Sequence, residues 1–245
     1  MTAPMPEQSA SSSNAAAPAQ TPRKPTVLPD LALPFAAATA FTALARVESG
    51  ATLGTIIGGH VAIILLLPPF TFAPSRPRRQ LQASAAVIAG VLAVWWTTLD
   101  RANFPIGPML RVSICTIAFR LNLAMLTIAA ERIGLGASAP GCVITIAIAF
   151  FTWPIWLAEH ISAATAARLA TIHPTLIANG LLTSTFPWFE QPIAYRDLTV
   201  LNQTIPCALP TNWLACTAVH GGIAAALAIG VMVRPKSLVA EKQSQ

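Results

Sequence analysis

Charged residues are scarce in this chain of 245 residues, where Lys, Arg, Asp and Glu together make up 10%. A typical soluble domain carries about 25%. The few charges are also unevenly placed. None occurs between Glu48 and Arg76, from Gln80 to Leu99, from Ile133 to Ala158 or from Leu198 to Val233. With 54% hydrophobic residues, the composition excludes a water-soluble globular protein and indicates an integral membrane protein.

Short motifs of enzymes and metalloproteins are missing as well. The sequence contains no G-x-S-x-G, no H-E-x-x-H, no phosphate loop of the G-x-x-x-x-G-K type and no C-x-x-C. We therefore assign no catalytic residue and no metal ligand from motifs, and a non-enzymatic protein is favoured. An ATP-driven function would require a separate ATPase chain. The basic excess flanks apolar runs, as in membrane proteins, so nucleic-acid binding is not expected.

Uncharged apolar runs define the predicted membrane crossings, because about 20 apolar residues are needed to cross about 30 Å of hydrocarbon. The clear runs are 53–72, 83–99, 112–130, 139–157 and 213–233. A sixth run, 31–45, is shorter and contains Pro34, so it either crosses with the help of its neighbours or lies in the interface. The predicted fold is an all-α, multi-pass transmembrane helical bundle with five clear spans and a sixth, weaker one.

Lys and Arg in the connections predict the orientation of this bundle through the positive-inside rule. The basic residues placed in the cytoplasm are Arg23, Lys24, Arg76, Arg78, Arg79, Arg132, Arg234, Lys236 and Lys242. Residues 31–233 then form the transmembrane domain of an inner or cell membrane, between cytoplasmic tails 1–30 and 234–245. The tail 1–30 is rich in Ala, Pro and Ser and has no apolar run, so we expect it to be disordered.

The connection 159–212 is far longer than the others and is predicted to be an outward-facing cap. Within it, 161–172 is typical of a short interfacial helix, and 176–186 is a candidate re-entrant piece. The orientation also places five tryptophans at the outer interface, where indole rings prefer to sit, and one in the outer loop. In that order they are Trp95, Trp96, Trp153, Trp156, Trp213 and Trp188. Cys115, Cys207 and Cys216 are expected near this outer side, where one bridge is chemically allowed, although free cysteines are the simpler expectation.

Polar residues in the run 112–130 and just beyond it follow a helical stripe. Ser113, Thr116, Arg120, Thr127 and Glu131 recur at spacings that place them on one face at 100° per residue. Such a stripe should point into the bundle, since an arginine at the centre of a bilayer must find partners. Two interpretations remain open: a polar pathway or substrate contact at Arg120, or an arginine that only joins neighbouring helices.

Two glycine-flanked histidines provide a cofactor hypothesis. Gly58-Gly59-His60 and His220-Gly221-Gly222 place each imidazole at a similar depth below the predicted outer surface. Histidines on facing helices, with glycines beside them, are able to hold a haem or a metal. The simpler interpretation is close helix packing at the glycines, without a cofactor.

Three functional hypotheses follow. The leading one is a non-enzymatic membrane component, either a transport or permease-type subunit or a partner of other membrane subunits, with an unknown substrate. The first alternative is a haem or metal protein using His60 and His220. The second is a membrane-embedded enzyme whose site lies on the outer cap, with candidates Glu159, His160, His173, Arg196 and Asp197.

Overall fold

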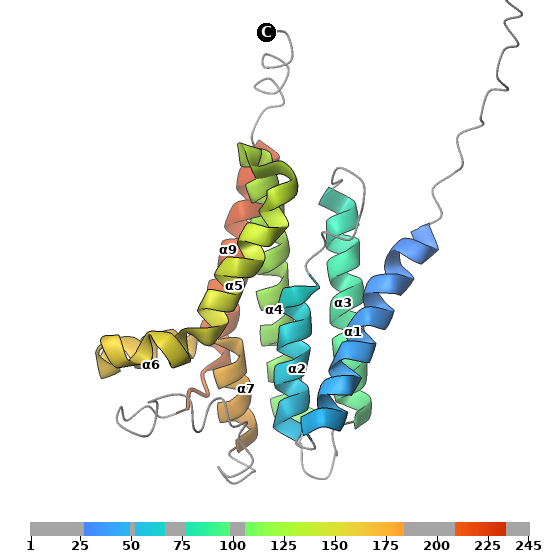
Figure 1. Ribbon diagram of the computed structural model, residues 1–245. Coiled ribbons are helices and arrows are strands. Elements are labelled where there is room, and N and C mark those ends of the chain that lie inside the picture. The colour runs from blue at the N-terminus through green and yellow to red at the C-terminus, as the bar shows by residue number, and fades with distance from the viewer. Residues whose placement is uncertain (1–26, 50–51, 67–76, 99–105, 184–208, 234–245) are drawn as a thin grey trace, which may run out of the picture.

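A computed structural model describes residues 27–49, 52–66, 77–98, 106–183 and 209–233. Every regular element in these ranges is a helix, which confirms the all-α class (Figure 1). The main helices are α1 (Val27–Ser49), α2 (Thr52–Leu65), α3 (Pro77–Thr98), α4 (Ile106–Ala130), α5 (Ala139–Trp156), α6 (Ala163–Thr171), α7 (Pro174–Thr183) and α9 (Trp213–Val233).

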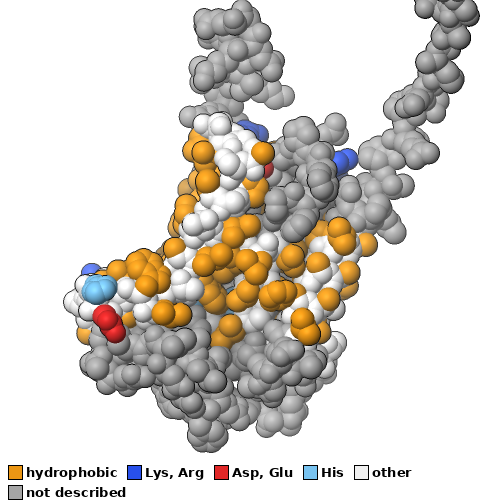
Figure 2. Space-filling view, in the orientation of Figure 1, with side chains coloured by type: hydrophobic (Ala, Val, Ile, Leu, Met, Phe, Trp, Pro, Cys, Tyr) orange, Lys and Arg blue, Asp and Glu red, His pale blue; other side chains and the backbone are white. Residues whose placement is uncertain are grey.

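Three helical stretches are long and apolar enough to cross a membrane: Pro77–Thr97, Ile106–Trp156 and Trp213–Val233. The second stretch contains both α4 and α5. It is interrupted at Gly134 and Gly136, whose φ angles of 108° and 50° lie in the left-handed region that favours glycine. Apolar side chains spread over the middle of the face in Figure 2, whereas the visible charged side chains lie near its ends. The membrane class predicted from composition is therefore confirmed.

Helix α2 covers only part of the predicted crossing 53–72. Its 14 residues span about 21 Å, and Figure 1 shows it ending part-way along α3 and α4. One further turn bond, from Leu66 N to Ala62 O at 2.9 Å, closes its last turn. The run 53–72 was predicted to be one crossing. The sequence after Leu66 contains Pro68 and Pro69, which disfavour a continuing helix.

Helix α1 is longer than the weak candidate run 31–45. It has 23 residues and begins at Val27, inside the segment predicted to be a disordered tail, while residues 1–26 lie outside the described ranges. Pro34 is accommodated within the helix. The helix packs closely on α3, where an added Cβ at Gly90 would lie 2.7 Å from the carbonyl oxygen of Phe35. Tertiary packing thus supports a helix that hydropathy alone marked as weak.

The connection after α5 contains two short helices of different character. Helix α6 lies within the run 161–172, which was predicted to be a short interfacial helix, and projects sideways from the bundle in Figure 1. Its first turn is capped by Ser162 Oγ, which accepts a bond from Thr165 N at 3.2 Å. Helix α7 is buried over most of its length, and Gly180 lies directly against the carbonyl group of Pro210. The part of the candidate re-entrant piece beyond residue 183 lies outside the described residues.

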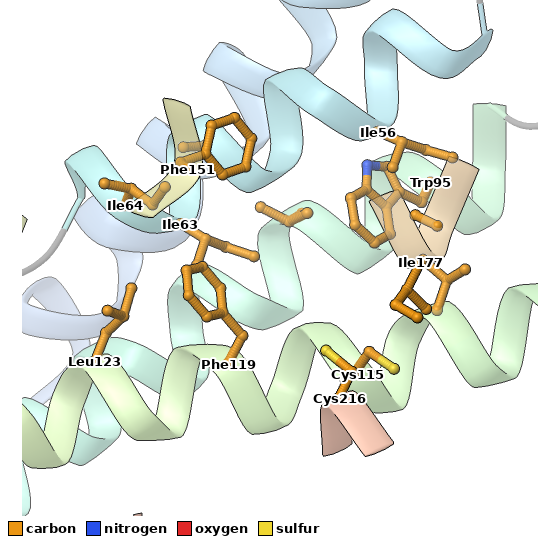
Figure 3. Packing of buried hydrophobic residues seen from close by; sticks show 14 of the residues in the cluster. Ile56, Ile63, Ile64, Trp95, Cys115, Phe119, Leu123, Phe151, Ile177 and Cys216 are labelled. Carbon is orange, nitrogen blue, oxygen red and sulfur yellow. The ribbon is translucent and has the colours of Figure 1, made fainter. Parts of the chain in front are cut away.

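The core between α2, α3, α4 and α7 is apolar and contains an indole ring. Figure 3 shows Trp95 beside Ile56 and Ile177, with Phe119 close to Ile63. Trp95 Nε1 donates to Thr55 O at 3.1 Å. Both Trp95 and Trp153 are buried, so their rings pack against protein and not against headgroups, while their position at the outer interface stays a prediction. The absence of a side chain at Gly59 lets the Trp95 ring lie directly against α2.

Candidate functional site: a buried polar cluster between the short helices

The polar stripe of α4 lies inside the bundle. Ser113, Thr116, Arg120 and Thr127 are buried, while Glu131 is half-buried. Three residues of the stripe bond to other helices. Ser113 Oγ accepts from Trp96 Nε1 at 3.3 Å, and Thr116 Oγ1 lies 3.1 Å from His60 Nε2. Glu131 Oε1 accepts from Gln80 Nε2 at 2.6 Å. Thr127 Oγ1 instead donates to Leu123 O of its own helix at 2.9 Å. The stripe therefore joins α4 to α2 and α3.

Arg120 contacts the end of α2. Its side chain is 0% exposed. Nη1 donates to Ile63 O, and Nη2 donates to Leu66 O at 3.0 Å. The last carbonyls of a helix lack intrahelical donors, and the C-terminus carries a partial negative charge of about half an elementary charge. The guanidinium thus donates hydrogen bonds to two carbonyl groups at the C-terminal end of α2, which ends inside the bundle.

His60, on α2, links its own helix to the stripe. Its Nδ1 lies 3.0 Å from Ile56 O, one turn earlier, and a carbonyl accepts only from a protonated nitrogen. In a neutral ring, Nε2 must then accept the proton of Thr116 Oγ1. That hydroxyl also lies 2.8 Å from Val112 O, to which it has the alternative of donating. The Thr116 hydroxyl therefore has one proton for two acceptors.

His220, on α9, is held in one neutral tautomer. Its Nε2 donates to Ile172 O at 2.9 Å. Its Nδ1, 2.9 Å from Asn122 Nδ2, then accepts from that amide group. The two bonds join α9 to the C-terminal end of α6 and to α4.

His173 precedes α7 and is fully buried. Its Nε2 donates to Phe151 O at 3.0 Å, and its Nδ1 accepts from Leu176 N at 3.3 Å, as an N-terminal cap does. The residue lies outside the three membrane-spanning stretches. Burial lowers the pKa of His173 to about 4. The ring is therefore neutral at physiological pH.

These three histidines surround two phenylalanines of α5. The ring centroid of Phe150 lies 5.5 Å from that of His173 and 6.0 Å from that of His220. Phe151 lies 5.2 Å from His173 and 6.4 Å from His60. We call these five residues the histidine–phenylalanine cluster. It forms where both short helices, α2 and α7, meet the long helices.

The hypothesis of a haem or metal between His60 and His220 meets a specific geometric obstacle. All four ring nitrogens of the two residues lie within hydrogen-bonding distance of protein atoms. Phe119 also packs edge-on to His220, at 5.1 Å between centroids. A ligated iron would need at least one of these bonds to break. Among the described residues, no group of three or more His, Cys, Asp or Glu has the arrangement of a metal site.

The glycines beside the two histidines differ in their surroundings. An added Cβ at Gly59 would lie 2.6 Å from the Trp95 ring, so this glycine permits close packing of α2 on α3. At Gly221 and Gly222 an added Cβ would meet nothing within 4 Å. Close packing at both motifs was the simpler sequence interpretation. It applies to Gly59 and is wrong for Gly221 and Gly222.

The candidates for an outer enzymatic site do not converge within the described residues. Glu159 and His160 are exposed in the short turn η3 (Ala158–His160), whereas His173 points into the bundle. Arg196 and Asp197 lie outside the described residues. The sequence analysis missed the buried roles of His173 and Asn122. Asn122 is a lone amide in an apolar run, a signal that marks an intramembrane hydrogen bond.

No known family model matches this sequence, and neither a curated protein nor a solved structure shows significant similarity to it.

Proposed function

We propose that this chain is a transport or permease-type component of a cell membrane. Its substrate path would follow the α4 stripe, past α2 and α7. The observation that carries the proposal is the pair of short helices inside a bundle of longer ones. Helices that stop within a membrane bundle are tolerated where protein or a water-filled cavity surrounds their ends. In transport proteins such broken helices commonly form the substrate or ion site near the middle of the bilayer.

Three finer features belong to the same proposal. They are six crossings with both tails in the cytoplasm, an outward-facing cap over 159–212, and residence in the inner or cell membrane. The Lys and Arg distribution supports the orientation. Helix α1 supports the sixth crossing, because its 23 residues reach about 35 Å.

A water-accessibility experiment tests the path without knowledge of the substrate. The native cysteines are first replaced by serine, and Thr116→Cys is compared with Leu121→Cys in intact membranes. Thr116 is fully buried on the stripe, whereas Leu121 is exposed on the same helix. We expect a small, charged methanethiosulfonate to modify Cys at 116 and to leave Cys at 121 unmodified.

The opposite result separates the alternatives. If Thr116→Cys stays unmodified in a folded protein, the transport path is wrong, and stable copurification with other membrane proteins would favour a complex subunit. A haem on His60 and His220 would be seen as Soret absorbance that disappears in either His→Ala variant. Neither the haem nor the enzyme hypothesis is favoured by a contact among the described residues.

A further inference from the structure

Arg120 has more hydrogen-bond donors than its protein partners use. A guanidinium carries five N–H groups. One from Nη1 reaches Ile63 O and one from Nη2 reaches Leu66 O, while Nε has no acceptor although it is buried. Buried donors without acceptors are unusual in native proteins and point to a missing partner such as a water or an ion.

Among the described residues, Arg120 also has no carboxylate at its depth along α4. Glu131 is about 16 Å further along α4 at 1.5 Å per residue, and Glu159 is exposed beyond α5. The charge-free runs of the sequence supply no other Asp or Glu to the middle of the bundle. The partial negative charge at the end of α2 offsets only part of a full charge, and an uncompensated buried charge is costly.

From these two observations we infer that Arg120 binds a small carboxylate anion at the C-terminal end of α2. This inference rests on the proposed transport function, because it makes a carboxylate the substrate class of that path. The two carbonyls each accept one N–H, from Nη1 and from Nη2. Nε and a remaining Nη hydrogen form the side of the fork, whose spacing matches the two oxygens of a carboxylate.

The surroundings favour a monovalent organic anion over an inorganic one. On α4, Thr116 and Ala124 lie one turn on either side of Arg120, and both are buried. Ile63, whose carbonyl accepts from Arg120, and Phe119, the residue before Arg120, both belong to the apolar core and lie close together in Figure 3. A strongly hydrated sulfate or phosphate would lose more solvation there than a carboxylate with an apolar tail.

Thermal unfolding of the purified full-length protein in detergent tests the inference, with sodium acetate as the probe. Acetamide is the neutral probe of the same shape, and sodium chloride at equal ionic strength is the salt control. We expect a saturable rise in Tm with acetate alone. In Arg120→Lys, which keeps the charge and loses the planar fork, half-saturation should need at least tenfold more acetate. Arg132→Gln is the matched control, since Arg132 donates to Val231 O at an exposed helix end, and its acetate response should equal that of the wild type.

If Arg120→Lys fails to fold, Ala124→Asp replaces it as the locating variant. A carboxylate one turn from Arg120 should substitute for acetate, so this variant should no longer respond to it. The inference is overturned if acetate raises Tm no more than acetamide or chloride does. It is also overturned if the folded variant, Arg120→Lys or Ala124→Asp, shows the same acetate-dependent rise in Tm as the wild type. Failure of the proposed transport path can be distinguished from failure of the carboxylate site. Acetate stabilisation without accessibility at position 116 would overturn the path alone, whereas accessibility without acetate stabilisation would overturn only the carboxylate.

Discussion

At the scale of single residues, the buried basic side chains hold backbone carbonyl groups. Arg120 donates to the end of α2, and each buried histidine ring lies within hydrogen-bonding distance of a carbonyl oxygen. The histidine pairs are His60 with Ile56 O, His173 with Phe151 O, and His220 with Ile172 O. Carbonyls at helix ends and near a proline such as Pro154 lack some helical donors, and hydrocarbon supplies none. Arg120 thereby joins the end of α2 to α4, and His173 joins the proline-containing α5 to the start of α7.

The bonds of Arg120 predict a stability difference between two arginines. Arg120→Leu leaves Ile63 O and Leu66 O without donors, so it should lower the free energy of unfolding by about 1–3 kcal/mol. Arg132→Leu removes one bond to Val231 O at an exposed site and should change it by less than about 0.5 kcal/mol. Thermal or denaturant unfolding in detergent measures both. Equal effects would show that Arg120 does not cap α2.

The buried ring of His173 predicts that the fold loses stability in mild acid. Its pKa is lowered from 6.5 to about 4, so the folded state favours the neutral ring. Its contribution is therefore complete above pH 6.5 and declines as the pH falls towards 4, by about 1.4 kcal/mol per pH unit within that window. His173→Asn keeps a capping side chain without titrating, and its unfolding temperature should fall less between pH 7.5 and 5.5. An identical fall in both proteins would contradict the assignment.

At the scale of helices, contacts between elements distant in the sequence determine the arrangement. Helix α2 packs on α3 at Gly59, α1 packs on α3 at Gly90, and α4 packs along α9. Cys115 of α4 and Cys216 of α9 lie side by side in Figure 3, and each thiol donates to a carbonyl oxygen, of Trp213 and Ile172 respectively. Of these pairings, the one at Gly59 holds the short helix α2 against α3.

Packing at Gly59 predicts opposite effects for two glycine substitutions. In Gly59→Ala the new methyl group meets the Trp95 ring, so α2 and α3 must separate, with a loss of about 1–3 kcal/mol. In Gly221→Ala the methyl group meets open space, and alanine gains up to about 1 kcal/mol from helix propensity. Tryptophan fluorescence during thermal unfolding reports both. A tolerated Gly59→Ala would refute the close approach.

The neighbouring thiols predict a specific crosslink between α4 and α9. Cys115 and Cys216 are both free, and a dithiol oxidant such as diamide should join them by removing two electrons and two protons. Protection of both thiols from a maleimide mass tag, reversed by dithiothreitol, is the expected readout. Cys142 is exposed and should remain reactive. If both tags are still added after oxidation, the two helices do not pack in this register.

At the scale of the whole molecule, the surface and the interior have separate roles. The apolar surface in Figure 2 suits hydrocarbon, and the polar groups of the spans are gathered inside. Charged side chains gather towards the ends, where the headgroups lie. The bundle therefore combines a lipid-compatible exterior with an apolar core that holds a stripe of buried polar side chains on α4.

The distribution of basic residues predicts the orientation of this bundle. In intact cells, Pro77→Cys or Ala240→Cys should resist an impermeant thiol reagent, whereas Glu190→Cys should react, because basic connections stay in the cytoplasm. Labelling in the opposite sense would reverse the topology. Labelling of Ala10→Cys would show that α1 does not cross the membrane.

The sequence by itself determined the membrane class, the helical fold and most helix positions. Long apolar runs without charge are stable in hydrocarbon. No water is available there, so the backbone N–H and C=O groups of each run bond to each other in a helix. The run 213–233 became α9 with the same limits, and the stripe from Ser113 to Glu131 showed which face of α4 turns inward. Only the tertiary structure decided that α2 stops at Leu65, that Arg120 serves its end, and that His173 joins His60 and His220 around α5. Each of these depends on side chains that meet from separate helices, and the period of a single helix carries no information about its partners.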